Sequence, residues 1–224
     1  FMLFGFFALA AGMYLLTATT TERGHESPDH PQAGRPTRLR PLIPIYIGGI
    51  CMGLAHRGVL SFMPLHMSNS FTDSVAPILV GGLLTALVLA SGMFGQILGG
   101  YWGDRYARPR LMWLIILGNI PLLILMTYTT GMALVIMAIA WGVLSFAYQP
   151  VTNALISDFS SARQRGTLFG IFHGLAFGVG ALAATLAGAV GDAWGTAAIF
   201  LVMGLLLIPG LWAGWLLKRS LAPL

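Results

Sequence analysis

The chain has 224 residues, of which 57% are hydrophobic and only 8% are charged, and its formal net charge at pH 7 is +5. A soluble fold with this composition would leave more apolar side chains exposed than a core could hide, so a soluble globular protein is excluded and a lipid bilayer is favoured. The net positive charge is compatible with two classes of protein, one that binds nucleic acid and a membrane protein with basic cytoplasmic loops. The placement of the arginines decides between them.

Apolar runs long enough to cross a bilayer follow one another along the chain. A helix needs about 20 residues to span about 30 Å of hydrocarbon. The runs lack the alternation of a membrane β-barrel, so we expect an all-α integral membrane protein. The expected spans are 1–17, 42–66, 75–102, 111–129, 131–156, 167–190 and 196–217.

The first 41 residues differ from the rest. Residues 1–17 start at Phe1 rather than an initiator Met and carry no flanking charge, so we expect the truncated end of a preceding helix, with an upstream portion missing. Residues 18–41 are polar, contain several prolines, and predict a flexible cytoplasmic linker. His25 and His30 lie there without further Cys or His nearby, so we expect no metal site.

The basic residues predict the orientation. All but one of the twelve lie in alternate connections or in the tail, and the exception is Arg57. The connections on the opposite side contain no Lys or Arg, and their only charged residues are Asp73 and Asp192. By the positive-inside rule the basic side is cytoplasmic, which places the C-terminus in the cytoplasm and removes the basic patch that a nucleic acid would need.

Two charged connections carry a family resemblance. The segment 100–110 is similar to the loop signature of the major facilitator superfamily, which joins the second and third helices of each six-helix half. The segment 158–166 resembles that family's connection between the fourth and fifth helices, and 191–195 resembles the close of the fifth. The matching residues are Gly100, Gly103, Asp104, Arg105, Arg108 and Arg110 in the first loop, and Asp158, Arg163 and Arg165 in the second.

The resemblance implies a fold and a function. Residues 42–219 would form the six-helix C-terminal half of a transporter, 1–17 the end of the helix before it, and 18–41 the link between halves. The protein would be a secondary carrier working by alternating access. Asp104 would act as a conformational latch at a helix N-terminus of the other half, the alternative being a solvated carboxylate paired locally with Arg105 or Arg108.

Small residues form two stripes at i+4 spacing, each on one helix face. The resemblance implies that both stripes dock against the missing N-terminal half, and packing within the present six helices is the alternative. The first stripe is Ser91, Gly95, Gly99 and Gly103, and the second stripe is Gly166, Gly170, Gly174 and Gly178.

Polar residues inside the spans indicate where a solute would bind, because each is costly in lipid unless it serves a pathway or a partner. Arg57 is the first candidate, as a bidentate ligand for an anion, unless a partner neutralises it. Its neighbour His56 would shuttle protons or form a buried hydrogen bond to backbone. Tyr148, Gln149 and Asn153, near a helix-bending Pro150, are further cavity candidates.

No Asp or Glu falls within a span, so proton coupling would use His56 or His173, or would lie in the missing half. The sequence has no hydrolase, thiol-redox or phosphate-binding signature, so we expect neither an enzyme nor a cofactor.

Arg57, together with 61–65 and 174–180, is similar to drug-efflux carriers of the fosmidomycin-resistance type. That likeness implies proton-coupled efflux of a drug-like or anionic compound through the inner or plasma membrane. A sugar or carboxylate uptake carrier and a non-transporting membrane scaffold are the alternatives. The expected partners are a small solute, the lipid bilayer and the N-terminal half.

Overall fold

The computed structural model describes residues 36–72 and 76–221, and throughout these ranges the regular structure is helical. The expected span 1–17 and most of the expected linker lie outside the described residues. The helices are α2 (Leu39–Ser70), α3 (Pro77–Arg105), α4 (Arg108–Tyr128), α5 (Gly131–Phe159), α6 (Arg165–Gly180), α7 (Leu182–Trp194), α8 (Thr196–Leu205) and α9 (Ile208–Ser220).

Within the described residues, six helical runs are long and apolar enough to cross a membrane: α2, α3, α4, α5, α6 with α7, and α8 with α9. The prediction of an all-α membrane fold is therefore confirmed, and the protein is a multi-pass membrane protein. The helices extend past the predicted spans by a few residues; α2, for example, begins at Leu39 rather than at residue 42. Helices do not stop where the apolar run stops, because a polar turn at the interface still forms backbone hydrogen bonds.

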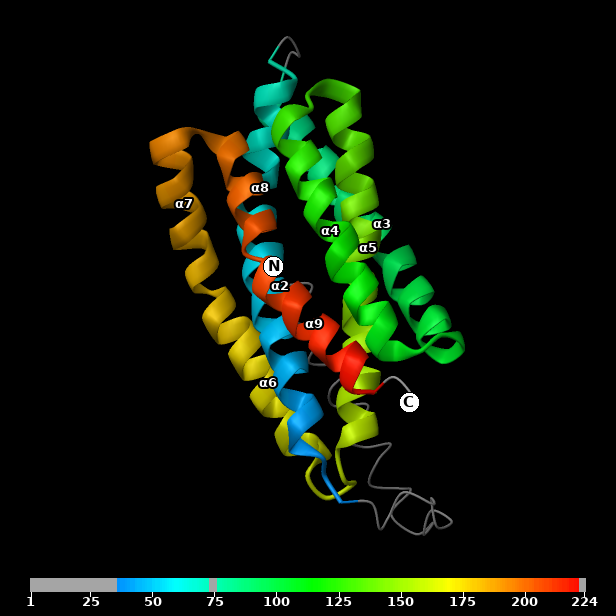
Figure 1. Ribbon diagram of the computed structural model, residues 1–224. Helices are drawn as coiled ribbons and strands as arrows, with labels where there is room; N and C mark the ends of the chain where they lie inside the picture. The colour runs from blue at the N-terminus through cyan, green and yellow to red at the C-terminus, as the bar shows by residue number, and fades with distance from the viewer. Residues whose placement is uncertain (1–35, 73–75, 222–224) are drawn as a thin grey trace, which may run out of the picture. The chain divides into compact units, whose positions relative to one another are not determined.

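Very short connections make neighbouring helices antiparallel. Tyr106 and Ala107 alone separate α3 from α4, and a single residue, Gly195, separates α7 from α8. Gly195 has φ +85°, a conformation that glycine adopts without strain. The arginine-bearing ends of α2, α3, α4, α6 and α9 consequently gather at one end of the helices, the lower end in Figure 1.

The spans predicted as continuous at 167–190 and 196–217 are each interrupted. The first breaks at Ala181, whose backbone N–H is shared between the carbonyls of Phe177 and Gly178. The second breaks at Leu206 and Leu207, just before Pro209 in the first turn of α9. Proline has no N–H to donate and its ring crowds the preceding turn, which accounts for the second break.

The first stripe packs inside the bundle, so the expectation that it docks against another half is wrong for these residues. A Cβ on Gly95 would collide with the backbone of Val143, and a Cβ on Gly99 would collide with the backbone of Ala147, both on α5. The glycines let α3 and α5 approach backbone to backbone, which is how helices associate where lipid removes the hydrophobic drive.

The second stripe has the opposite environment. A Cβ added at Gly166, Gly170, Gly174 or Gly178 would meet no atom of the described residues within 4 Å. All four residues are exposed on α6. Small residues at the same i+4 spacing are therefore buried in a helix contact on α3 and exposed on α6.

Candidate functional site

A cavity of about 580 Å³ lies between α2, α5 and the α6–α7 pair. Its volume is in the range of small-molecule sites. The lining residues are Gly49, Met52, Gly53, His56, Arg57, Leu60, Ser61, Ser145, Phe146, Tyr148, Gln149, Thr152, Phe172, His173, Ala176, Phe177, Gly180, Ala181 and Ala184. It thus brings together five of the predicted residues, His56, Arg57, Tyr148, Gln149 and His173, from three spans.

Arg57, near the middle of α2, is exposed to this cavity. Its Cζ lies 4.8 Å from the centre of the Phe177 ring, a cation–π contact. Its stem passes close to Gly180, where an added Cβ would come within 3.0 Å of the arginine Cδ. Among the described residues no carboxylate forms an ion pair with Arg57, so the alternative of a neutralising partner finds no support in this part of the chain.

His56, next to Arg57 on α2, also lines the cavity and contacts α5. Its Nδ1 lies 2.8 Å from the Ser145 hydroxyl oxygen, so its partner is a side chain of α5 and not the backbone. The ring stacks on Trp141 at 5.3 Å between centroids and meets Phe146 edge-on at 4.9 Å. These contacts fix the ring plane and join α2 to α5 at the cavity wall.

The polar residues of α5 that line the cavity share one face of the helix. Tyr148 and Gln149 line the cavity as expected, together with Ser145 and Thr152, one turn before and after. Asn153 is not a lining residue, contrary to the prediction; its Oδ1 is buried and has no hydrogen-bond partner among the described residues. Asn153 follows Thr152 by one position and is turned about 100° from it around the helix.

The sequence predicted that Pro150 bends α5, and the structure shows no interruption of the helix at that residue. The helix continues to Phe159. The interruption beside the cavity is the one at Ala181, between α6 and α7, and both Gly180 and Ala181 line the cavity.

His173 lines the cavity from α6 within an aromatic group. Its Nδ1 lies 3.0 Å from the carbonyl oxygen of Phe169, one turn earlier, and its ring contacts Phe169, Phe172 and Phe177. Sequence reasoning missed Phe172 and Phe177. The signal was available, because 169, 172, 173, 176 and 177 share one face of a helix.

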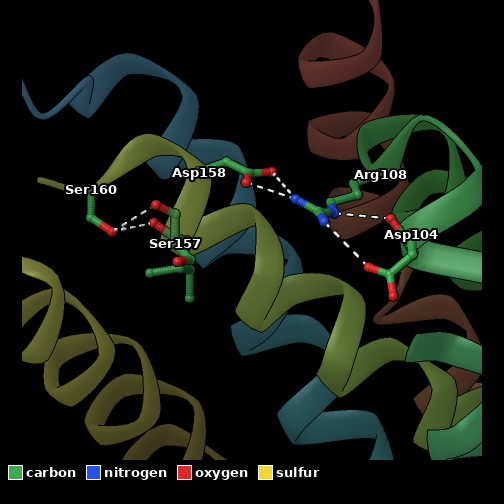
Figure 2. Close-up of polar contacts among 7 residues, drawn as sticks. Asp104, Arg108, Ser157, Asp158 and Ser160 are labelled. Carbon is green, nitrogen blue, oxygen red and sulfur yellow. Dashed lines mark hydrogen bonds and ion pairs between the residues drawn. The ribbon is translucent and has the colours of Figure 1, made fainter. Parts of the chain in front are cut away.

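The two predicted cytoplasmic loops meet through Arg108 (Figure 2). Its Nη1 donates to both carboxylate oxygens of Asp158, at 2.7 and 2.6 Å, and its Nε donates to the carbonyl of Gly103 at 2.9 Å. Asp104 lies farther from Arg108, at 3.5 Å, with its side chain 80% exposed. Arg108 therefore fastens the α3–α4 turn to the end of α5, and Asp104 adopts the locally paired arrangement that was the alternative to a latch.

The other loop residues are placed at helix ends. Gly100, Gly103 and Asp104 lie in the last turns of α3, whereas Arg110 is exposed in the first turn of α4. Arg105 ends α3 and stacks on Tyr101, with Cζ 3.7 Å from the ring centre.

In the second loop, Arg163 is exposed in the connection and Arg165 begins α6. A contact that the sequence did not indicate joins this loop to the start of α2. The Thr37 hydroxyl donates to Gln164 Oε1 at 2.6 Å and accepts from the backbone N–H of Ser161 at 3.0 Å.

Comparison with known proteins agrees with this architecture. The family model described as Major Facilitator Superfamily matches residues 45–223, which is most of the chain. A search of curated proteins gave no match. The chain therefore belongs to the major facilitator superfamily, whose members are secondary transporters and not enzymes.

Proposed function

We propose that this chain forms the C-terminal half of a carrier that exports a drug-like or anionic solute in exchange for protons, by alternating access at the cavity around Arg57. The observation that carries the proposal is a mid-span arginine that lines the cavity and has no ion-pair partner among the described residues. The carrier would lie in the cell membrane, with its basic helix ends and C-terminus in the cytoplasm.

The cost of Arg57 in lipid supports a protein- or water-covered cavity. An arginine at the bilayer centre costs about 2.5–3.5 kcal/mol on insertion scales and more in simulations. Arg57 sits near the middle of α2, at a distance from the end where the other basic residues gather. Such a residue persists where it faces a polar cavity and serves a solute.

The surroundings of Arg57 favour an anion with an apolar body. A guanidinium offers a planar pair of donors to a carboxylate or phosphonate, and an arginine already neutralised could not do so. Phe146, Phe172 and Phe177 supply apolar surface in the same cavity. Local likeness at 61–65 and 174–180 to fosmidomycin-resistance-type carriers makes fosmidomycin, an anionic phosphonate, a suitable probe.

The uncovered face of α6 supports a second six-helix half as the partner of this one. Gly174 and Gly178 leave open space beside His173 and Phe177, which line the cavity. A second half packed on this stripe would close the cavity from the other side. In that assembly the exposed Asp104 would be available to act as the latch.

Proton coupling in this half would fall to His56 or His173. Within the described residues no carboxylate lines the cavity, whereas both histidines do. A carboxylate in the other half is the alternative carrier of the proton.

The test is uptake of radiolabelled fosmidomycin into inverted proteoliposomes that contain the full-length protein under an imposed pH gradient. We expect Arg57→Ala to lower transport by roughly tenfold or more, because a hydrogen bond to a charged group contributes about 1.5–3 kcal/mol. Arg57→Lys should keep part of the activity, since it retains the charge without the bidentate geometry. Arg163→Ala, which removes an exposed arginine outside the cavity, is the matched control.

Four results would decide against the proposal. Wild-type transport by Arg57→Ala would remove the anion site, and flux indifferent to the pH gradient would remove proton antiport. Accumulation of glucose or lactate in place of fosmidomycin would favour an uptake carrier, and absence of flux for every probe would favour a scaffold.

A further inference from the structure

A second hollow lies between the start of α2 and the end of α9, away from the cavity that contains Arg57. We call it the α2–α9 groove; its volume is about 830 Å³. Its lining is apolar apart from two arginines and a serine. The residues are Arg38, Leu39, Arg40, Pro41, Ile43, Pro44, Ile47, Trp212, Ala213, Leu216, Leu217, Ser220 and Leu221.

The apolar wall of the groove is exposed. The exposed fractions are 61% for Ile43 and 63% for Trp212, and Ile47 and Leu216 are each 38% exposed. Along α2 the groove runs from Arg38 to Ile47, a rise of about 14 Å at 1.5 Å per residue. That depth is close to half of a hydrocarbon core about 30 Å thick, so the groove has the length of one leaflet.

The rim of the groove is basic and unneutralised. Arg38 and Arg40 are both exposed, and neither forms an ion pair within the described residues. The basic side chains at the end of α9 are engaged differently: Lys218 lies over the Trp113 ring at 4.3 Å, and Arg219 lies over the Trp215 ring at 5.2 Å.

Tryptophan and basic residues together mark the level of the lipid headgroups. Trp113, Trp215 and the two cations above them therefore place this end of the groove at the membrane surface. Arg38 and Arg40, which have no ion-pair partner among the described residues, line the groove together with Ser220 and Leu221 at the end of α9, and the apolar wall extends from there toward Ile47.

We propose that the α2–α9 groove binds one anionic phospholipid, with its phosphate on Arg38 and Arg40 and an acyl chain along Ile43, Ile47, Trp212 and Leu216. The charge of the rim selects an anionic headgroup, because each basic residue near the surface attracts anionic lipid. The length and exposure of the wall select a lipid over a free anion, since a soluble phosphate would contact only the rim. This site is independent of the solute proposed for the cavity.

The test uses the purified full-length protein, titrated in detergent with phosphatidylglycerol and followed by native mass spectrometry. We expect the double variant R38Q/R40Q to bind phosphatidylglycerol about tenfold to thirtyfold more weakly than wild type. The matched control R110Q/R163Q removes two exposed arginines outside the groove and should change binding less than threefold. Thermal unfolding of both double variants checks that each is folded, which their exposed side chains lead us to expect.

Two further measurements separate a lipid in the groove from other occupants. Glycerol 3-phosphate, which carries the phosphate without acyl chains, should not compete with phosphatidylglycerol at equal concentration. Phosphatidylglycerol with a photoreactive acyl chain should label 43–47 and 212–216. The proposal is overturned by equal loss of binding in both double variants, by equal binding of phosphatidylcholine, by competition from glycerol 3-phosphate, or by labelling confined to other helices.

Discussion

The two stripes of small residues share one sequence pattern and have opposite surroundings. On α3, Gly95 and Gly99 face the backbone of α5 so closely that a methyl group would not fit. On α6, the four glycines of the second stripe face open space. The pattern indicates that another helix can pack closely against that face. It does not state which helix approaches: the stripe on α3 packs against α5, whereas the stripe on α6 is uncovered among the described residues.

The largest effect is expected from Gly95→Leu. The added side chain would meet the backbone of Val143, which cannot move aside as a flexible side chain can, so α3 and α5 must separate. Overpacking of this kind costs up to about 3 kcal/mol, which lowers Tm by roughly 6–12 °C in a chain of this size. Thermal unfolding of the purified protein measures the change.

Gly82→Leu is the matched control for that variant. It is the same substitution on the same helix, at an exposed glycine that has nothing within 4 Å. Its Tm should stay within about 2 °C of wild type, in line with a cost below about 0.5 kcal/mol for an exposed site. Equal Tm values for Gly95→Leu and Gly82→Leu would contradict the α3–α5 contact.

Gly174→Leu should separate stability from transport. The site is open, so Tm should change by less than about 2 °C. If the second stripe receives a partner half, the new side chain would hold the two surfaces apart and reduce transport by roughly tenfold, about 1.4 kcal/mol. Transport by Gly82→Leu provides the comparison, and undiminished transport by Gly174→Leu would show that nothing docks on this stripe.

The smallest effect on stability is expected at the ion pair that joins the α3–α4 turn to the end of α5. Arg108 donates from Nη1 to both carboxylate oxygens of Asp158, and both groups are partly exposed, so a double-mutant cycle with Arg108→Gln and Asp158→Asn should give a coupling of about 0.5–1 kcal/mol. The cycle of Arg108→Gln with Asp104→Asn should give a coupling near zero, because Asp104 is highly exposed and 3.5 Å away. Chemical denaturation of each variant measures both cycles, and equal couplings would mean that Arg108 does not prefer Asp158.

Most of the fold was predictable because bilayer thickness converts apolar length directly into helices. The broken spans were harder. The break before Pro209 has a sequence cause that periodicity alone does not reveal, and the break at Ala181 comes directly after Gly178 and Gly180, which are poor helix formers. The shared hydrogen bond at Ala181 arises in a tertiary setting, next to Arg57 and the cavity.

The candidate cavity was predictable in part for a similar reason. Polar residues at mid-span are conspicuous in an apolar chain, so Arg57, His56, Tyr148, Gln149 and His173 stand out without a structure. Ser145 and the phenylalanines of the cavity do not, because a hydroxyl or an aromatic ring is ordinary anywhere in such a helix. Asn153 is as polar as Gln149 and lies one turn away on α5, yet it is not among the lining residues, which the sequence pattern alone does not reveal.

Composition and apolar length alone predicted the six spans that fall within the described residues, and the placement of the arginines predicted the end that all of the described ones except Arg57 share, because the cost of polar groups in lipid acts on each residue separately. The partners of each face were decided by tertiary packing. Whether a glycine stripe meets α5 or stays open, whether Arg108 pairs with Asp158 or Asp104, and whether Arg57 meets a carboxylate or an aromatic ring depend on which helices come together, and pairwise contacts of that kind are not encoded in the pattern of any one segment.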